Sequence, residues 1–408
     1  MTTPARHSLA IIGAGPVGLE AAAAALELGF DVHVFERGDV GMHPTAWGHV
    51  RMFTPWSLNV GPASERLLKA NGWNAPPADE CPTGQELADL VLAPLAATEA
   101  LRGRVHTHAQ VVQVSRRALL RHERIGDAAR ADEPFRLLVR DAGGRESVLH
   151  AFALIDASGT FGTSAWAGSG GVPARGELYL APQMSYRPDD VTGLRRERHA
   201  GKRTMVVGSG ASAATTVTAL AQLAAEVPGT TAVWVTRGAA ALDGEVAGDT
   251  LARRAELFAG ARALLGGSNE SVQHVGGAEV EGFEYNTGTH RYRVTLQCGE
   301  QARIEEVDQV ILNVGYRPDH SITSGLQGHF CWATRGAMKL SAALLGADGG
   351  GDCMVAPAGG AELLCHPEPN FFVIGAKSYG SSSAFLLRTG YQQAADVLAL
   401  LGSKLPRD

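Results

Sequence analysis

The sequence predicts an α/β fold with two domains, each of which contains a strand, a glycine-rich turn and a helix in succession. Two segments of one kind carry this prediction, Gly-Ala-Gly-Pro-Val-Gly at 13–18 and Gly-Ser-Gly-Ala-Ser-Ala at 208–213. Each follows a short apolar run, 9–12 or 204–207, and precedes a run with apolar residues at helical spacing. The length of 408 residues agrees with two or three domains, because domains average about 150 residues.

The first turn has the spacing of a dinucleotide-binding fingerprint. Gly13 suits the tight turn, Gly15 lets a phosphate approach the backbone, and Gly18 lets the helix pack on the strand. The next strand, 31–35, ends in Glu36, near the ~20-residue spacing at which a carboxylate accepts ribose hydroxyls. We therefore expect a nucleotide with a bare ribose here; an ordinary strand-to-helix connection is the alternative.

The second turn differs in two respects. Ala213 stands in the place of the third glycine, a replacement that the fingerprint allows. The following strand, 232–236, ends in Arg237, whose forked, charged donors suit a ribose 2′-phosphate. The pair of turns thus predicts FAD at the first and NADPH at the second. A solvated strand-end charge is the alternative for Arg237, and NADH stays open as the reductant.

Charge and hydropathy exclude several classes of partner. The formal net charge of -6 and the pI of about 6.2 provide no basic field for nucleic acid. The chain has no apolar stretch of about 18 residues and no apolar segment near its N-terminus that resembles a signal peptide. We expect a cytoplasmic enzyme that acts on a small molecule without a membrane; a homo-oligomer stays open.

Cysteine chemistry has little support. The five cysteines include no Cys-x-x-Cys spacing and suggest neither a metal site nor a disulfide framework. A dithiol relay from a flavin to a protein is therefore disfavoured, although Cys353 and Cys365 leave a noncontiguous redox pair open.

Between the two turns, apolar and polar residues alternate over 104–115 and 135–140, as in strands, with a charged loop at 116–133. A buried strand is expected at 151–156, followed by small residues that let the backbone approach a nucleotide. A stretch rich in Gly, Ser, Ala and Pro at 163–185 predicts the crossover into the second domain.

The first turn with Glu36, the strand end Ile-Asp-Ala-Ser-Gly at 155–159, the second turn and the segment 310–319 together resemble the two-dinucleotide-binding-domain flavoproteins. Within them, the chain is most similar to the flavin-containing monooxygenase and N-hydroxylase branch. The resemblance implies two Rossmann-like dinucleotide-binding domains, an FAD domain with an inserted NAD(P)H domain, and the boundaries 1–170, 171–307 and 308–408.

The predicted contacts follow from the fingerprints and the resemblance. For FAD they are Gly13, Ala14, Gly15, Pro16, Val17, Gly18, Glu36, Arg37, Trp47, Val111, Ala157, Ser158, Gly159, Gly375, Ala376 and Lys377. For NADPH they are Gly208, Ser209, Gly210, Ala211, Ser212, Ala213, Thr236, Arg237, Gly315 and Tyr316. In relatives, the residues that correspond to Gly315 and Tyr316 border both cofactors; a packed strand-end aromatic is the alternative for Tyr316.

The C-terminal segment predicts a strand at 369–375, a turn at 376–383 and a helix at 384–401. In relatives, this helix begins near the pyrimidine end of the flavin. Many relatives of the disulfide-reductase type carry an Asp directly after the strand's glycine, whereas Ala376 and Lys377 follow it here. Lys377 is either a cation beside the flavin or a surface lysine at a helix entrance.

The segment 43–56 lies where relatives place a flavin-covering loop, and it holds two tryptophans, two histidines and an arginine. Trp47 could cover the flavin, His49 or His43 could transfer a proton, and Arg51 could neutralise an anion. Structural histidines and core tryptophans are the alternatives. The Gly-Gly-x-Trp motif of the monooxygenase branch is only partly present at 46–48.

The resemblance implies an NADPH-dependent FAD monooxygenase that uses molecular oxygen. Such an enzyme oxygenates nitrogen or sulfur, or inserts oxygen beside a ketone, through a flavin hydroperoxide. The tentative catalytic residues are His49, Arg51 and Lys377, and no metal is expected. Two alternatives stay open, an NAD(P)H-dependent flavin reductase without oxygen insertion and a non-catalytic redox sensor.

Overall fold

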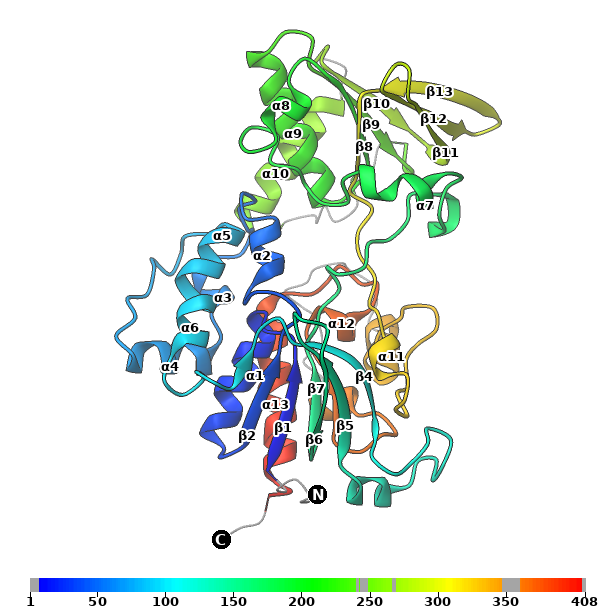
Figure 1. The fold of residues 1–408 in the computed structure, drawn as a ribbon. Helices are drawn as coiled ribbons and strands as arrows, with labels where there is room; N and C mark the ends of the chain where they lie inside the picture. The colour runs from blue at the N-terminus through cyan, green and yellow to red at the C-terminus, as the bar shows by residue number, and fades with distance from the viewer. Residues whose placement is uncertain (1–6, 240–241, 243–248, 266–268, 347–359, 406–408) are drawn as a thin grey trace. The chain divides into compact units, whose positions relative to one another are not determined.

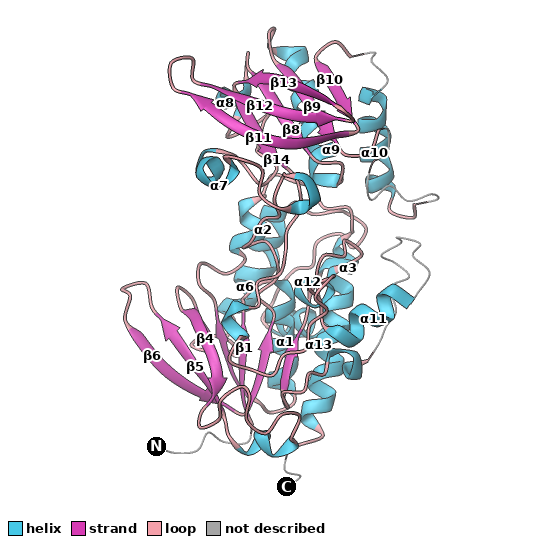
Figure 2. Cartoon of the chain, turned by 90° about the vertical axis from the view of Figure 1, so that its right-hand side faces the viewer, coloured by secondary structure: helices cyan, strands magenta, loops and turns pink. Residues whose placement is uncertain are grey.

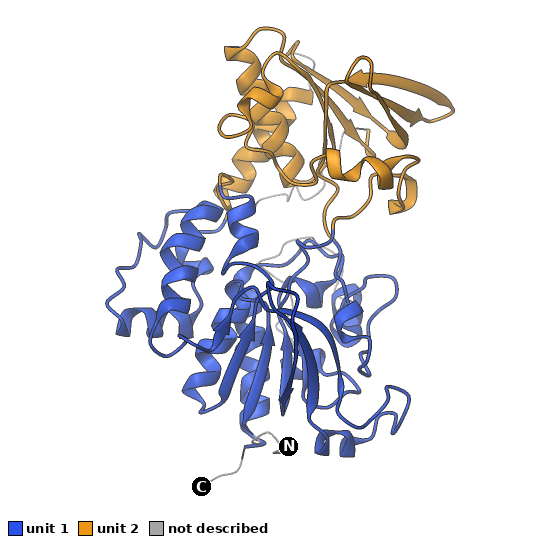
Figure 3. Ribbon diagram, viewed as in Figure 1, with its two compact units in different colours: residues 1–48, 54–163, 317–408 blue, residues 49–53, 164–316 orange. Residues whose placement is uncertain are grey.

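A computed structural model describes residues 7–239, 242, 249–265, 269–346 and 360–405. The chain forms two compact units (Figure 3). Unit 1 contains residues 1–48, 54–163 and 317–408, and unit 2 contains residues 49–53 and 164–316.

The core of unit 1 is a five-stranded parallel sheet in the order β15-β7-β1-β2-β3. Its strands are β1 (Ser8–Ile12), β2 (Asp31–Phe35), β3 (Val105–His106), β7 (Ala153–Asp156) and β15 (Phe371–Val373). The predicted strands at 9–12, 31–35, 151–156 and 369–375 all belong to this sheet. The N-terminal and C-terminal parts of the chain thus meet beside β7.

Each face of this sheet is covered (Figures 1 and 2). The helices α1 (Pro16–Glu27) and α13 (Leu387–Gly402) lie side by side along one face. An antiparallel sheet of β4 (Gln110–Arg116), β5 (Phe135–Arg140) and β6 (Glu146–Ala151) covers the other. Alternate residues of β1 face opposite sides, so Ala10 and Ile12 pack with Val114, Phe135 and Leu137 in one apolar cluster.

Shorter helices complete unit 1: α2 (Met42–Ala46), α3 (Trp56–Asn59), α4 (Pro62–Ala70), α5 (Gly84–Leu87), α6 (Ala93–Ala97), α11 (Met338–Gly346) and α12 (Ala376–Tyr379). The N-terminus of α4 is capped by a side chain of α1. The buried Glu20 carboxylate accepts hydrogen bonds from the backbone N–H groups of Ala63 and Ser64, at 2.9 and 2.8 Å. A carboxylate there satisfies free N–H groups and the helix dipole, and it fixes α4 to α1.

The charged stretch at 116–133 is anchored by a buried ion cluster. Glu368 accepts hydrogen bonds from Arg116 Nε at 2.7 Å and from Arg130 Nη2 at 2.8 Å, and all three side chains are fully buried. Arg116 also stacks 3.7 Å above the centroid of the Phe135 ring and donates to the backbone oxygen of Glu133 at 2.6 Å. The predicted loop is therefore fixed to the C-terminal part of unit 1 by charge-assisted hydrogen bonds.

Unit 2 repeats the layered plan. Its parallel sheet has the order β10-β9-β8-β14. Its strands are β8 (Arg203–Val207), β9 (Thr231–Thr236), β10 (Val272–Gly276) and β14 (Gln309–Leu312). Apolar side chains of α9 (Ala211–Glu226) and α10 (Ala252–Leu265) cluster with one set of strand residues, including Val206 and Trp234. The side chains on the other face of these parallel strands pack against an antiparallel sheet. This second sheet consists of β11 (Ala278–Asn286), β12 (Arg291–Cys298) and β13 (Gln301–Val307).

Two short helices, α7 (Glu177–Leu180) and α8 (Arg196–His199), precede the parallel sheet of unit 2 in the chain.

The strand β14 belongs to a different part of the chain's fold than the sequence predicts. The boundary predicted at 307/308 places it in the C-terminal part of the first domain, but β14 pairs with β8 in the sheet of unit 2. The apolar run alone does not reveal its partner, because strand pairing is a long-range property.

Candidate functional site

The first glycine loop connects β1 to α1, and its glycines are required by geometry. Gly13 has φ of +101°, and a Cβ there would lie 2.8 Å from the carbonyl oxygen of Ala157. A Cβ on Gly18 would lie 2.0 Å from the carbonyl oxygen of Gly13. Gly15, by contrast, faces open space. The loop is thus tightly packed at two glycines and accessible at the third.

The helix that follows this loop begins without a side-chain cap. Gly15 is the N-cap residue of α1, Pro16 occupies the first turn, and no side chain accepts a hydrogen bond from the first turn. The free N–H groups and the dipole of the helix therefore favour an anion beside Gly15. These residues fit a dinucleotide pyrophosphate.

Glu36 lies directly beside the same loop. Its carboxylate is nearly buried and accepts the N–H of Ala14 at 2.9 Å and that of Gly38 at 3.0 Å. A carboxylate offers about four acceptor positions, so these two hydrogen bonds leave capacity for a ribose hydroxyl. The side chain therefore connects the loop to the end of β2 and remains a candidate ribose acceptor.

The next residue, Arg37, turns toward α2. Its Nη2 lies 3.2 Å from His43 Nε2, and a Cβ on Gly162 would approach Nη2 to 2.7 Å. The ring of Phe161 lies 6.0 Å from that of His43 and 6.1 Å from that of Trp47, centroid to centroid. The rings of His43 and Trp47 thus both lie near Phe161, which follows the end of β7, and a cofactor-covering role for this segment stays a prediction.

The remaining residues of the segment 43–56 divide between the units. His49 and Arg51 are exposed and belong to unit 2, whereas Trp47 belongs to unit 1. Lys377, the third predicted catalytic residue, lies outside this segment and also belongs to unit 1. Catalytic roles for His49 and Arg51 stay predictions. Val111, another predicted FAD contact, belongs to β4, and its side chain lies in the apolar core.

A buried ion pair lies under the first glycine loop. Lys377 Nζ is 2.6 Å from Asp156 Oδ2 and 3.0 Å from Ser158 Oγ. The exposed fractions of the Lys377 and Asp156 side chains are 1% and 0%. Asp156 Oδ1 accepts both the N–H and the hydroxyl of Ser158, at 3.1 and 2.6 Å. The interpretation of Lys377 as a surface lysine is therefore wrong.

This ion pair escaped the sequence analysis because its partners are 221 residues apart. Asp156 ends β7, and Lys377 lies in α12, just after β15. Since β7 and β15 are parallel neighbours, their carboxyl ends meet at one edge of the sheet. Ser158 Cα would lie 3.0 Å from a Cβ on Gly13, so the pair fixes a segment that supports the glycine loop.

Gly375 connects the C-terminal strand to the first loop. Its φ is +75°, its N–H donates to Gln393 Oε1 at 2.8 Å, and a Cβ there would lie 3.6 Å from Val17. Ala376 then begins α12, a short helix where the sequence predicts a turn. The structure thus brings together three predicted FAD segments in unit 1, namely 13–18, 157–159 and 375–377.

The second glycine loop resembles the first, most closely at the N-cap residue of the helix that follows. Gly208 has φ of +135°, and a Cβ there would lie 2.3 Å from the carbonyl oxygen of Asn313. Gly210, the N-cap residue of α9, has φ and ψ of −85° and −177°, against −83° and −175° for Gly15. Ala213, in the place of the third glycine, is buried in the apolar cluster of α9 and β8.

The end of β9 carries the predicted specificity residues. Arg237 is exposed, and its contact with a 2′-phosphate stays a prediction. Thr236 is buried and donates to the carbonyl oxygen of Gly238 at 2.7 Å, with His274 Nε2 at 2.8 Å from its hydroxyl. Burial lowers the pKa of His274, so this imidazole is neutral near pH 7. Sequence reasoning missed His274, because only strand pairing places β10 beside β9.

Gly315 and Tyr316 lie at the end of unit 2. Gly315 has φ of +88°, and its carbonyl oxygen accepts the N–H of Ala165 at 2.9 Å. The Tyr316 hydroxyl donates to the carbonyl oxygen of Tyr186 at 3.3 Å, and burial raises its pKa although Arg187 opposes the shift. The predicted position of Gly315 and Tyr316 between two cofactors stays a prediction.

Among the described residues, Cys81, Cys298, Cys331 and Cys365 are not part of a disulfide, whereas Cys353 lies outside the described residues. No group of three or more His, Cys, Asp or Glu side chains in the described part of the chain is arranged to hold a metal ion. None of the helices described has the length and apolar character needed to cross a bilayer.

Comparisons with known proteins agree with this architecture. Residues 8–45, which include the first glycine loop and Glu36, match the pyridine nucleotide-disulphide oxidoreductase family. Bacillithiol disulfide reductase Bdr (YpdA) from Bacillus cereus has a similar structure, with a TM-score of 0.70 and 16% identity over 98% of this chain and 99% of that one. The chain has the fold of the two-dinucleotide-binding flavoproteins.

Monooxygenases show the same likeness. DfoA from Erwinia amylovora, a cadaverine monooxygenase solved with FAD, aligns with a TM-score of 0.64 and 16% identity over 98% of this chain and 96% of that one. The ornithine N-hydroxylase KtzI from Kutzneria sp. 744 aligns with a TM-score of 0.62 and 16% identity over 98% and 99%. No curated protein is similar enough in sequence to match the chain. The predicted fold class and the resemblance are confirmed at the level of the fold.

Proposed function

We propose that this protein is an NADPH-dependent FAD monooxygenase that oxygenates a small molecule. FAD would bind unit 1, with its pyrophosphate at Gly15 and the start of α1 and its ribose at Glu36. The open space at Gly15 and the uncapped helix support this assignment. DfoA was solved with FAD bound, and KtzI was solved with reduced FAD and NADP⁺.

NADPH would bind unit 2 at the second glycine loop. The near-identical backbone at Gly15 and Gly210 supports a second dinucleotide there. The exposed Arg237 at the end of β9 would bind the 2′-phosphate with two parallel N–H donors. NADH would lack this contact and would bind more weakly.

Bound FAD would supply the redox chemistry, since it accepts a hydride from the nicotinamide and passes electrons to molecular oxygen. The residues of this chain would hold and orient the cofactor. Asp156 and Lys377 fix Ser158 under the glycine loop, and Gln393 holds the Gly375 N–H at the adjacent strand end. Because Lys377 is neutralised by Asp156, we assign it a positioning role rather than a proton-transfer role.

The absence of a dithiol motif is the main reason to propose molecular oxygen as the electron acceptor. The whole sequence contains no Cys-x-x-Cys, the spacing with which a dithiol takes electrons from a flavin, and only the more widely spaced Cys353 and Cys365 stay open as a thiol pair. A flavoprotein that is reduced by NADPH and lacks such a pair needs another acceptor. Molecular oxygen with a small organic substrate satisfies this need.

A reductase without oxygen insertion is the second candidate, and one thiol favours it. Cys331 Sγ accepts the N–H of Thr334 at 3.5 Å, and hydrogen bonds from the Thr334 side chain and backbone lower its pKa. A thiolate at this position is a competent nucleophile toward a disulfide. The likeness to bacillithiol disulfide reductase is equally compatible with this candidate.

Anaerobic reduction of the purified flavoprotein, followed by mixing with oxygen, tests the proposal. We expect NADPH to bleach the flavin, and oxygen uptake to rise when a panel of amines, sulfides and ketones is supplied. The protein would be a reductase instead if no substrate raised its oxygen uptake and if it turned over a disulfide anaerobically, with this turnover lost in Cys331→Ser.

A further inference from the structure

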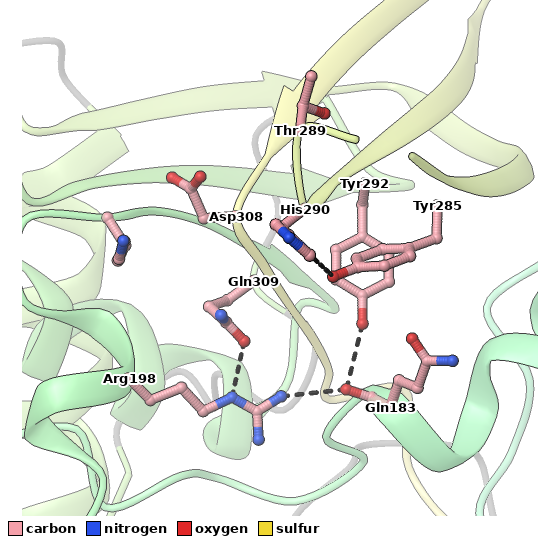
Figure 4. Close-up of a pocket in the computed structure, with 9 residues that line it drawn as sticks. Gln183, Arg198, Tyr285, Thr289, His290, Tyr292, Asp308 and Gln309 are labelled. Carbon is pink, nitrogen blue, oxygen red and sulfur yellow. Dashed lines mark hydrogen bonds between the residues drawn. The ribbon is translucent and has the colours of Figure 1, made fainter. Parts of the chain in front are cut away.

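A polar pocket of about 460 Å³ lies in unit 2, outside both glycine loops (Figure 4). Its walls come from the segment around α8, the hairpin between β11 and β12, and the residues that lead into β14. None of the residues that line it belongs to the predicted cofactor contacts. The pocket therefore needs a separate explanation.

The pocket lies at the amino ends of the parallel strands. Lys202 directly precedes β8, and Asp308 directly precedes β14, its parallel neighbour. The second glycine loop follows the opposite end of β8. Five residues of strand at about 3.3 Å each separate the two ends by roughly 16 Å. A nucleotide phosphate on the glycine loop is thus a full strand length away.

Arg198 is held in place beside the pocket. Its Nε donates to Gln309 Oε1 at 2.7 Å, and its Nη2 donates to the carbonyl oxygen of Gln183 at 3.1 Å. The Tyr292 hydroxyl donates to the same carbonyl oxygen at 3.2 Å (Figure 4). No hydrogen bond from Nη1 to a described residue is recorded. The guanidinium is therefore oriented in advance, with N–H donors left for a ligand.

The charge of the lining is positive. Asp308 is its one acid, and this carboxylate forms an ion pair with Arg291 Nε at 3.3 Å and accepts the N–H of Arg203 at 2.8 Å. The exposed ammonium of Lys202 has no recorded partner within the described ranges. Arg198 and Lys202 consequently remain as two cations without a matching acid in the lining.

An aromatic surface completes the pocket. Tyr285 is half-buried, and its ring meets that of Tyr292 edge to face, with 5.0 Å between centroids and 60° between planes. Tyr285 and Tyr292 are direct cross-strand partners on β11 and β12, so the hairpin fixes both rings. A flat ring could pack on Tyr285 while an attached anion reaches the two cations.

We propose that this pocket binds a small organic anion in which a phosphate or carboxylate group is attached to a flat ring. Arg198 and Lys202 bind the anionic group, and Tyr285 packs against the ring. The site is independent of the proposed oxygenation, because it uses neither glycine loop and none of the predicted cofactor contacts.

Phenyl phosphate and inorganic phosphate are the probes, titrated calorimetrically into the full-length protein with FAD and NADP⁺ at saturation. We expect phenyl phosphate to bind saturably and more tightly than phosphate. Arg198→Met should weaken both probes about tenfold or more, because charge-assisted hydrogen bonds are lost. Tyr285→Ser should weaken only phenyl phosphate. Arg195→Met, which removes an exposed cation at the start of α8 outside the pocket, is the matched control and should change neither.

Lys202→Met provides a test that does not depend on a buried side chain, since Lys202 is exposed. It should weaken both probes and leave NADPH binding unchanged. The proposal is overturned if wild-type protein does not bind phenyl phosphate saturably, or if Arg198→Met and Lys202→Met bind it as wild type does. It is also overturned if Gly210→Val, in the glycine loop, removes the binding that Lys202→Met retains.

Discussion

Replacing Lys377 with methionine should reveal how much the ion pair under the glycine loop contributes to unit 1. The substitution keeps most of the apolar stem but leaves the Asp156 carboxylate buried without its cation. The two side chains are 1% and 0% exposed, and Nζ to Oδ2 is 2.6 Å. Removal of one partner from such a pair costs about 3–5 kcal/mol. Since small proteins unfold with roughly 5–15 kcal/mol, this is a large share of the total.

Urea unfolding of the apoprotein and of the FAD-loaded protein measures this cost. Lys339→Met, on the exposed surface of α11, is the matched control and should change the unfolding free energy by less than about 0.5 kcal/mol. The double variant Asp156→Asn, Lys377→Met removes both charges and should recover part of the loss. If Lys377→Met costs no more than Lys339→Met and retains FAD as wild type does, the ion pair does not support the loop.

Three further predictions concern the other charged and glycine positions. Burial alone would raise the pKa of Glu368, but hydrogen bonds from Arg130, from the Gln327 N–H and from Arg116 hold it below the ordinary 4.5. Its ionised form therefore stabilises unit 1 above pH 4.5, and this contribution is lost as the pH falls through the depressed value. Glu368→Gln should lower the free energy of unfolding by about 3 kcal/mol or more at pH 7 and should weaken its dependence on pH in the acid range. An unchanged pH dependence in unfolding experiments would contradict this. Arg237→Ala should raise the KM for NADPH at least about tenfold and leave that for NADH unchanged in steady-state assays; equal losses would mean that Arg237 does not bind the 2′-phosphate. Gly15→Ala should unfold as wild type does but bind FAD weakly. Gly18→Ala should lower the melting temperature, because a Cβ on residue 18, unlike one on residue 15, would lie 2.0 Å from a backbone oxygen. Equal melting temperatures for the two variants would refute this packing argument.

Local patterns predicted a large part of the fold. The two glycine turns, the strands that precede them and the strand ends at Glu36 and Arg237 all depend on short-range spacing, and the structure places each as expected. The loop 208–213 even has the same N-cap conformation as the first loop, although it lacks the third glycine. Such features can be predicted from the sequence because they depend on residues that are close together in the chain.

The features that escaped are the ones that depend on distant residues. The pairing of β14 with β8, the contact of His274 with Thr236 and the ion pair of Asp156 with Lys377 each join segments far apart in the chain. The local sequence around a lysine that follows a strand's glycine does not reveal whether its side chain is exposed or buried. Only the parallel pairing of β7 with β15 places an acid within reach of it.

The near-identity of the two helix starts, at Gly15 and Gly210, has a consequence for how this chain distinguishes its proposed ligands. The two N-cap residues agree within a few degrees and both helices begin without a side-chain cap, so these helix starts present similar N–H groups to a diphosphate and discriminate little between two dinucleotides. Discrimination must then depend on one side chain at the end of the second strand of each unit, an acid in one and a guanidinium in the other. Cofactor preference in such a protein can change by a single substitution at a strand end while the scaffold stays intact.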